Sequence, residues 1–155
     1  MQQARKKKQT RVVKEKFSRG PISITPKTDR QGEYLKALRE SDQVLVLGPA
    51  GSGKTYISAS YAADQYAQNY INKIIITRPH VWAGEDRGFL KGDILEKTLP
   101  WARPVLDVLE EHLGKETVAS AIRNGNIEVA PLALMRGRSF KDAMVLVDES
   151  QNITF

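Results

Sequence analysis

A complete phosphate-loop pattern, G-x-x-x-x-G-K-[ST], is filled by the residues Gly48-Pro49-Ala50-Gly51-Ser52-Gly53-Lys54-Thr55. The apolar run 44–47 before it predicts a buried strand, and residues 56–70 after it contain no Pro or Gly and predict a helix. In such a loop the backbone N–H groups surround phosphate oxygens, Lys54 reaches the β and γ phosphates, and the Thr55 hydroxyl ligates Mg²⁺. A chance match, in which the glycines only form a turn, is the weaker interpretation. We therefore predict that these residues bind a nucleoside triphosphate.

Two adjacent carboxylates follow a second apolar run near the other end of the sequence. The run 144–147 predicts a buried strand, and Asp148 and Glu149 come directly after it. This is the Walker B pattern, in which Asp148 holds Mg²⁺ through its water shell and Glu149 orients and deprotonates the water that attacks the γ-phosphate. Taken alone, the pattern equally describes a strand that ends in an acidic turn. Together with the phosphate loop, it favours nucleotide hydrolysis over phosphoryl transfer to a small molecule.

The composition indicates one domain without a membrane segment. The 155 residues are 41% hydrophobic, which is enough for one core and too little for two. No apolar stretch approaches the length needed to cross a bilayer, and no apolar signal segment follows the basic N-terminus. The chain has no Cys and only two His, which leaves no thiolate or His cluster for a structural zinc site. These features fit a reducing compartment, and we expect a cytoplasmic protein.

The positive charge is concentrated at the N-terminus. Residues 1–19 contain eight Lys or Arg and one acid, a charge of +7, whereas the total is +6. The basic residues of this segment, 5–19, have little apolar company, so we expect residues 1–20 to form a flexible basic arm and residues 21–155 to form the folded domain. The arm has the charge to contact RNA or DNA phosphates in a salt-dependent manner. A solvated arm without a partner is the alternative.

Three polar residues outside the two motifs are further candidates. Gln31 precedes the phosphate loop by one expected helix, and a glutamine amide pairs with both N6 and N7 of adenine. Arg136 and Arg138 follow an expected strand and have the charge to contact nucleic acid or a γ-phosphate. For each of the three, an ordinary exposed side chain is the alternative interpretation.

The periodicity of the apolar residues predicts an α/β fold. The expected elements are strands at 44–47, 74–77, 127–130 and 144–147, and helices around 34–38, at 56–70, from Pro104 to Leu113 and at 115–124. The first strand, its helix and the second strand should form a right-handed parallel βαβ unit, with ligand at the carboxyl ends of the strands. Residues 78–93 are expected to be a long loop on the side of the site.

Several further blocks of sequence accompany the phosphate loop. They are Arg78 to Glu85, Gly88-Phe89-Leu90, Gly92-Asp93, Glu96-Lys97, Arg103-Pro104, Pro131 to Arg138, and Asp148-Glu149-x-Gln151-Asn152. Together they resemble the PhoH family of phosphate-starvation-inducible ATPases, which is common in bacteria and phages. The resemblance covers nearly everything from Thr25 to the end of the chain.

The resemblance implies a P-loop NTPase fold with a RecA-like core, similar to superfamily 1 helicases, in which helices sandwich a parallel sheet. It implies binding of ATP with Mg²⁺ and a link to RNA, in the cytoplasm of a bacterium or of a phage-infected host. It also implies adenine recognition by Gln31 and a catalytic, γ-phosphate-sensing role for Gln151 beside Lys54 and Glu149. By analogy with RecA-like ATPases, a homo-oligomeric ring is expected.

The sequence departs from the family where it stops, seven residues after Asp148. The family continues into a Leu-Thr-Arg segment and a further strand with a polar γ-phosphate sensor. In the family's sheet that strand lies between the phosphate-loop strand and the Walker B strand, so its absence would leave two buried edges unpaired. We therefore expect these residues to be the N-terminal part of a longer protein, or a truncated product that folds poorly alone.

Two functions of different class are compatible with these residues. The first is a Mg²⁺-dependent ATPase whose turnover is coupled to RNA or another single-stranded nucleic acid, with Lys54, Thr55, Asp148 and Glu149 as its chemistry. The second is a nucleotide-gated module that binds RNA or a partner with negligible hydrolysis. A small-molecule kinase ranks third. A guanine-specific switch is disfavoured because the sequence has no Asn-Lys-x-Asp.

Overall fold

The computed structural model describes residues 21–79 and 91–153. Its helices and strands, in chain order, are α1 Asp29–Glu40, α2 Lys54–Ala67, β1 Lys73–Arg78, α3 Lys91–Leu113, α4 Lys115–Arg123, β2 Ile127–Pro131, the 3₁₀ helix η1 Leu132–Met135, β3 Ala143–Val147 and the 3₁₀ helix η2 Ser150–Asn152. The predicted α/β class is confirmed. The basic arm and residues 80–90 of the predicted long loop lie outside the described residues.

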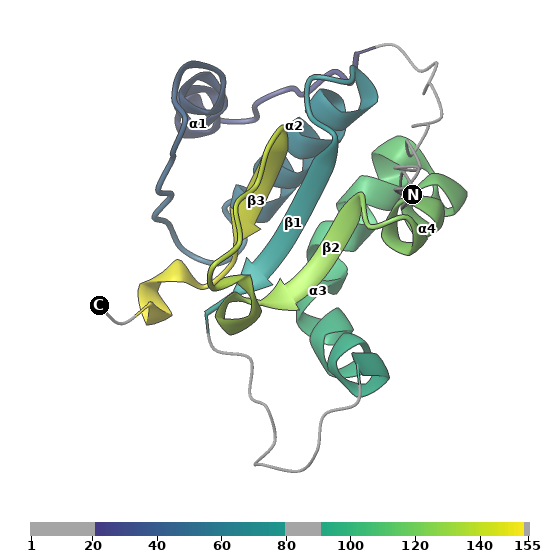
Figure 1. Cartoon of the computed structure of the whole chain (residues 1–155). Coiled ribbons are helices and arrows are strands. Elements are labelled where there is room, and N and C mark those ends of the chain that lie inside the picture. The colour runs from purple at the N-terminus through teal and green to yellow at the C-terminus, as the bar shows by residue number, and fades with distance from the viewer. Residues whose placement is uncertain (1–20, 80–90, 154–155) are drawn as a thin grey trace, which may run out of the picture.

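The three strands form one parallel sheet in the order β2-β1-β3, so β1 lies in the centre. Ile75 of β1 is in register with Glu128 of β2 and with Val145 of β3. Figure 1 shows that the strands run side by side in one direction, which brings their carboxyl ends to one edge of the sheet. In parallel α/β sheets ligands bind outside that edge.

One side of the sheet, which we call the helical face, carries the main core. Successive residues of a strand point to opposite sides, and Ile74 and Ile76 of β1 point to this one. Both are fully buried among apolar side chains of α2, α3 and α4. Burying such a side chain stabilises the fold by about 1.5–3 kcal/mol. Figure 1 shows α2 and α3 behind the strands in this arrangement.

The other side, which we call the open face, carries a smaller core. Ile75 packs there with Ala130 and Met135, the last residue of η1. Val145 and Val147 of β3 share this face by their register with β1, and they remain 40% and 39% exposed. Apolar surface of the sheet is therefore only partly covered on this side.

The strand predicted at 44–47 is wrong. Residues 43–49 form neither helix nor strand, and Leu45 and Leu47 are 74% and 83% exposed. In the described residues the sheet ends at β3, and no strand pairs with this run. An apolar run of four residues is not a stable strand without a backbone partner. The predicted βαβ unit therefore lacks its first strand.

The predicted start of the next long helix is also wrong. The sequence indicated Pro104, but α3 begins at Lys91 and includes both this proline and Pro100. A proline inside a helix removes a backbone hydrogen bond and costs about 3 kcal/mol or more. Packing offsets this cost, because Ala102 and Leu109 of α3 are fully buried in the main core. The last three residues of the predicted loop are therefore helical.

The remaining predicted elements are confirmed to within a few residues. Helices α1, α2 and α4 and strands β1, β2 and β3 lie where the apolar periodicity placed them. The segment before α1 is tied to the core, because the Ile22 N–H donates to Asp64 Oδ1 of α2 at 2.9 Å. Among the helices of the described ranges, none combines the length and hydropathy needed to cross a membrane.

Candidate nucleotide-binding site

The phosphate-loop residues form a turn that leads directly into α2. Gly51 and Gly53 have φ angles of 77° and 83°, a left-handed backbone that glycine adopts without strain. Gly53 is the N-cap of α2, and no side chain caps this helix. The first N–H groups of α2 and the positive end of its dipole are therefore available to an anion. This local geometry fits a phosphate group.

The side chain of Lys54 bends back into the loop. Its Nζ donates to the carbonyl oxygens of Gly48 and Pro49 at 2.6 and 2.7 Å, and it lies 3.3 Å from Ser52 Oγ. Ser52 Oγ itself donates to the Pro49 carbonyl at 2.7 Å. Three oxygens of the loop thus surround the ammonium group. A phosphate that enters the loop meets this positive charge.

Gln31 joins α1 to the phosphate loop. Its Nε2 donates to the Ser52 carbonyl at 3.1 Å, and its Oε1 accepts from the Lys27 backbone N–H at 2.7 Å. A Cβ added to Gly53 would lie 2.9 Å from this Nε2, so the loop and the amide approach closely. The structure places Gln31 beside the loop with its amide on protein backbone. Its reading of adenine stays a prediction.

Asp148 and Glu149 lie at the carboxyl end of β3, as predicted. The Asp148 N–H donates to the Thr77 carbonyl at 2.9 Å, which extends the pairing of β1 with β3 by one residue. Glu149 has a φ of 55° and is the N-cap residue that precedes η2. A non-glycine residue in this left-handed region costs of order 1 kcal/mol and persists only where its surroundings fix it. The partly exposed carboxylates are therefore held in place by backbone structure.

Arg78, the last residue of β1, contacts both carboxylates. Its Nη2 lies 3.5 Å from Asp148 Oδ2 and 3.4 Å from Glu149 Oε1. Its guanidinium Cζ lies 5.7 Å from the ring centroid of Trp101 in α3, within cation–π range. Arg78 was not among the predicted site residues, because the register between β1 and β3 is not visible in the sequence. The available signal was its place at the end of a predicted strand.

Gln151 holds the other oxygen of Glu149. Its Nε2 donates to Glu149 Oε2, whereas Arg78 faces Oε1. Each oxygen of this carboxylate therefore has a partner, one from β1 and one from η2. The contact orients Glu149 and occupies the amide of Gln151. Sensing of a γ-phosphate by Gln151 stays a prediction.

Arg138 belongs to a separate ion-pair cluster on the open face. It pairs through two nitrogens with Glu128 of β2, at 2.8 Å for Nη2, and its Cζ lies 5.0 Å from the ring centroid of Phe140. Lys73 Nζ is 2.8 Å from the same carboxylate. The hydrogen bond from Arg138 outweighs the effect of burial and, with a further contribution from Lys73, lowers the pKa of Glu128 to about 2.

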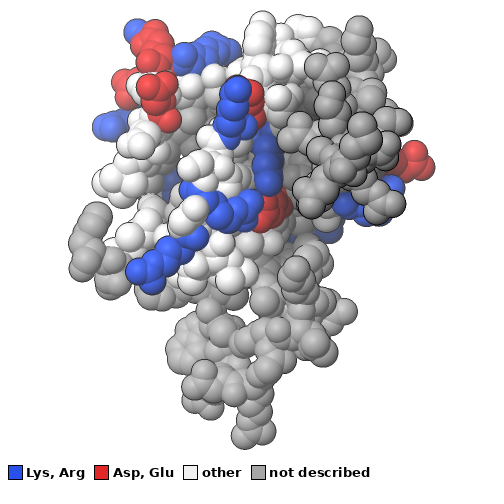
Figure 2. Space-filling view, viewed as in Figure 1, with Lys and Arg blue, Asp and Glu red and all other residues white. Residues whose placement is uncertain are grey.

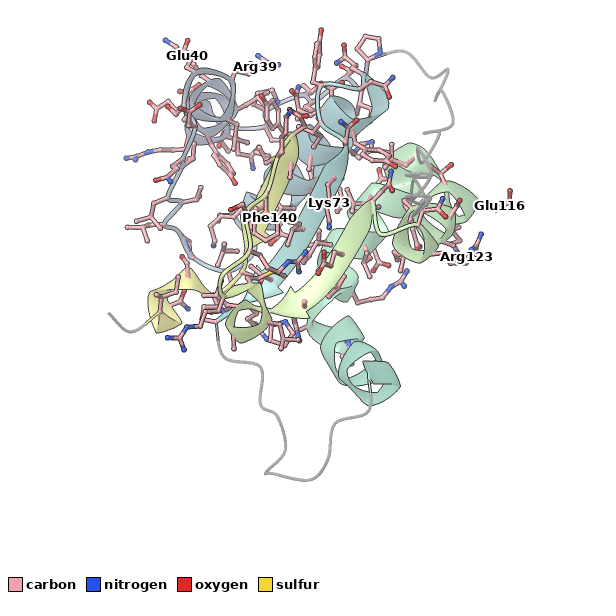
Figure 3. All side chains as sticks on the ribbon, viewed as in Figure 1. Arg39, Glu40, Lys73, Glu116, Arg123 and Phe140 are labelled. Carbon is pink, nitrogen blue, oxygen red and sulfur yellow. The ribbon has the colours of Figure 1, made fainter. Side chains whose placement is uncertain are left out.

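The open face is also the face on which basic side chains are visible. Figure 3 shows Lys73 and Phe140 in front of the sheet, and Figure 2 shows Lys and Arg side chains over the same region. Arg136 is exposed at the end of η1 and forms no salt bridge within the described residues. Arg138 lies on the same face, because its partner Glu128 is in register with Ile75. Contact of either arginine with nucleic acid stays a prediction.

The donor groups fit Mg²⁺ bound together with a nucleotide. Within the described ranges, no cluster of three or more His, Cys, Asp or Glu side chains is placed to hold a metal ion. The chain offers the Thr55 hydroxyl, at the start of α2, and the Asp148 carboxylate. Mg²⁺ is usually held by one or two protein oxygens, and phosphate oxygens and water supply the other ligands. These two protein oxygens would therefore be sufficient to hold the ion beside a nucleotide.

Comparison with known proteins shows which family this chain belongs to. The family model described as "PhoH-like protein" matches residues 23–155. The chain belongs to the PhoH-like family. Members of this family are P-loop NTPases, and the predicted P-loop fold class is confirmed by the match together with the parallel sheet.

Curated relatives in several bacteria carry the same family name. The chain is 44% identical over 144 residues to a PhoH-like protein of Synechocystis and 48% identical over 132 residues to a PhoH-like protein of Bacillus subtilis. It is 45% identical over 139 residues to Protein PhoH of Escherichia coli. These matches cover 93%, 85% and 88% of this chain, but only 44%, 41% and 39% of the relatives. The chain therefore spans less than half the length of the PhoH-like relatives it matches.

Proposed function

We propose that this chain binds ATP with Mg²⁺ at residues 48–55 and hydrolyses the bond between its β and γ phosphates. Turnover is coupled to RNA or to another single-stranded nucleic acid. The observation that carries the proposal is the position of Lys54 Nζ, surrounded by three oxygens of a loop that opens onto the uncapped start of α2. Membership of the PhoH-like family supports the same conclusion.

Binding exchanges one set of oxygens around Lys54 for another. The ammonium releases the carbonyls of Gly48 and Pro49 and donates to phosphate oxygens, which carry a full negative charge and accept stronger hydrogen bonds. The N–H groups at the start of α2 donate to the same phosphates. Thr55 and Asp148 would hold Mg²⁺, which neutralises phosphate charge and orients the γ-phosphate.

Hydrolysis depends on Glu149. Its carboxylate is held on one side by Arg78 and on the other by Gln151, so its orientation is set before substrate binds. Such a carboxylate positions a water molecule and accepts its proton as the water attacks the γ-phosphate. A fixed general base contributes about 10²- to 10⁴-fold to the rate.

Coupling to nucleic acid is supported by charge. The basic segment 5–19, together with Arg136 and Arg138, supplies the cations for a contact with the phosphate backbone. Such a contact is independent of sequence and weakens as salt rises. We expect single-stranded RNA to stimulate ATP hydrolysis at low salt and to lose this effect at high salt. A cytoplasmic, ring-forming homo-oligomer is part of the same proposal, by analogy with RecA-like ATPases.

The second candidate is a nucleotide-gated binding module. The observation that favours it is that Arg78 and Gln151 occupy both oxygens of Glu149, which leaves neither oxygen free to accept a proton from water. Such a module would bind ATP and switch its affinity for RNA with negligible hydrolysis. The two candidates share the phosphate loop and differ only in what Glu149 does.

Two variants test the proposal. Lys54→Ala should abolish ATP binding, measured as loss of the upward shift in melting temperature that Mg²⁺ and ATP cause. Glu149→Gln should keep that shift and lower phosphate release at least about 100-fold. Lys36→Ala, which changes an exposed lysine of α1, is the matched control.

Each outcome separates the candidates. A folded Lys54→Ala protein that hydrolyses ATP at the rate of the unchanged chain would refute the nucleotide site. Detectable hydrolysis in the unchanged chain that Glu149→Gln removes supports the ATPase. ATP binding without hydrolysis in either protein supports the binding module.

A further inference from the structure

Arg78 and Asp148 occupy matching places on neighbouring strands. Thr77 of β1 pairs with Val147 of β3, and Arg78 and Asp148 are the residues that follow them. By the alternation of a strand, both side chains point to the helical face, where α2 lies with the phosphate loop at its start. Arg78 therefore lies beside Asp148, the residue that would ligate the metal.

We propose that Arg78 is a positioning residue that competes with Mg²⁺ for Asp148 and keeps Glu149 oriented. Without metal, its guanidinium bridges the two carboxylates. Asp148 would exchange Arg78 for Mg²⁺ when the ion and a nucleotide are present, and Arg78 would remain paired with Glu149. The inference rests on the proposed function, because it takes Asp148 as a metal ligand and Glu149 as the general base.

The contacts of Arg78 explain why this position suits an arginine. Two adjacent carboxylates repel each other, and the guanidinium reduces the charge of the group from −2 to −1. The ring of Trp101 lies against the guanidinium and limits its movement. Gln151 occupies Oε2 of Glu149, which leaves Oε1 for Arg78. The planar guanidinium supports several directed contacts at once, which a lysine ammonium does less well.

The first test measures metal affinity in the complete 155-residue chain without nucleotide. Mn²⁺ is the probe, because electron paramagnetic resonance measures the concentration of the free ion directly. Arg78→Gln should bind Mn²⁺ about fivefold more tightly, since the positive charge that competes with the ion for Asp148 is removed. Equal affinity in this variant and in the unchanged chain would overturn the proposal.

Arg103→Gln is the matched control for this measurement. Arg103 also pairs with two carboxylates, those of Asp107 and Glu110, but both lie with it on α3. Its removal should leave Mn²⁺ affinity unchanged. A rise in affinity equal to that of Arg78→Gln would show a general effect of net charge and would also overturn the proposal.

The second test separates positioning from metal competition. Arg78→Gln should lower the Mg²⁺ concentration needed for half-maximal hydrolysis and should lower kcat about tenfold, because Glu149 loses one of its two partners. Arg78→Lys should return the metal affinity to that of the unchanged chain, because this affinity depends on charge. It should not restore kcat, which depends on the geometry of the contact. A fall in kcat with unchanged metal dependence in both variants would contradict the competition for Asp148.

Failure of the inference and failure of the proposed function give different results. If the unchanged chain binds Mn²⁺ but no ATP, the proposed function fails, whatever Arg78→Gln does. If the unchanged chain binds ATP and Arg78→Gln keeps its Mn²⁺ affinity, only the inference fails. Loss of a cooperative melt in both Arg78→Gln and Arg78→Lys would assign Arg78 to the fold and refute its positioning role.

Discussion

The two apolar runs that precede the site motifs differ in what holds them. β3 pairs with β1 along its whole length, and Met144 and Leu146 pack against the main core. The run 44–47 has no strand partner in the described residues, and Leu45 and Leu47 are exposed. The acidic pair is therefore positioned by a sheet, whereas the phosphate loop is positioned by α2 and by its contact with α1.

The difference shows which part of such a site is local. The turn at the phosphate loop depends on glycines at two left-handed positions and on the helix that follows, all within a few residues. The placement of the acidic pair depends on β1, which is remote in sequence. An apolar run forms a strand only when another strand offers its backbone. The same sequence pattern therefore forms a strand at 144–147 and none at 44–47.

Truncating one leucine in each run gives the largest expected effect. Leu146→Ala should lower the free energy of unfolding by about 2 kcal/mol, at the lower end for core leucines because its side chain is partly buried. Leu47→Ala should change it by less than about 0.5 kcal/mol, as for other exposed positions. Urea titration of both variants measures the difference. Equal losses would mean that Leu47 is buried by a partner in solution and would break the contrast.

This contrast also explains what the sequence could and could not predict. The phosphate loop, α2 and the acidic pair were predicted because their signals are short and local. The start of α3 was not, because burial of Ala102 outweighs the usual effect of a proline, and burial is a tertiary property. Arg78 was missed as a site residue because its contacts depend on the register of two strands.

A second prediction concerns the contact between Gln31 and the loop. Gly53→Ala should destabilise the protein by about 1.5 kcal/mol, because alanine is strained at a φ of 83° and its Cβ would approach Gln31 Nε2 to 2.9 Å. Gly51→Ala is the matched control, since its φ is similar but nothing lies within 4 Å of the added Cβ. Its smaller loss, about 1 kcal/mol, measures backbone strain alone.

A double-mutant cycle isolates the close approach. Adding Gln31→Ala to Gly53→Ala should recover part of the loss, because the crowded amide is gone, whereas adding it to Gly51→Ala should not. Urea titration of the unchanged chain, the three single variants and the two double variants gives the coupling in each pair. Strict additivity in both pairs would show that the contact with α1 does not affect the loop. The phosphate loop would then be positioned by α2 alone.

The smallest expected change in stability concerns an ion-pair cluster of the sheet. In this cluster Glu128 of β2 pairs with Lys73 and Arg138. The folded-state pKa of about 2 is below the ordinary value of 4.5, so the unfolded chain takes up the proton first as pH falls. The ion pairs therefore contribute stability above pH 4.5 and lose it towards pH 2. Because the cluster is partly exposed, we expect this contribution to be about 0.5–1 kcal/mol.

Glu128→Gln should lower the free energy of unfolding by this amount at pH 7 and flatten its dependence on pH below pH 4.5. Glu33→Gln, which changes an exposed residue of α1, should keep that dependence. Identical slopes in the two variants would show that packing of β1 against its neighbours, without this cluster, holds the sheet.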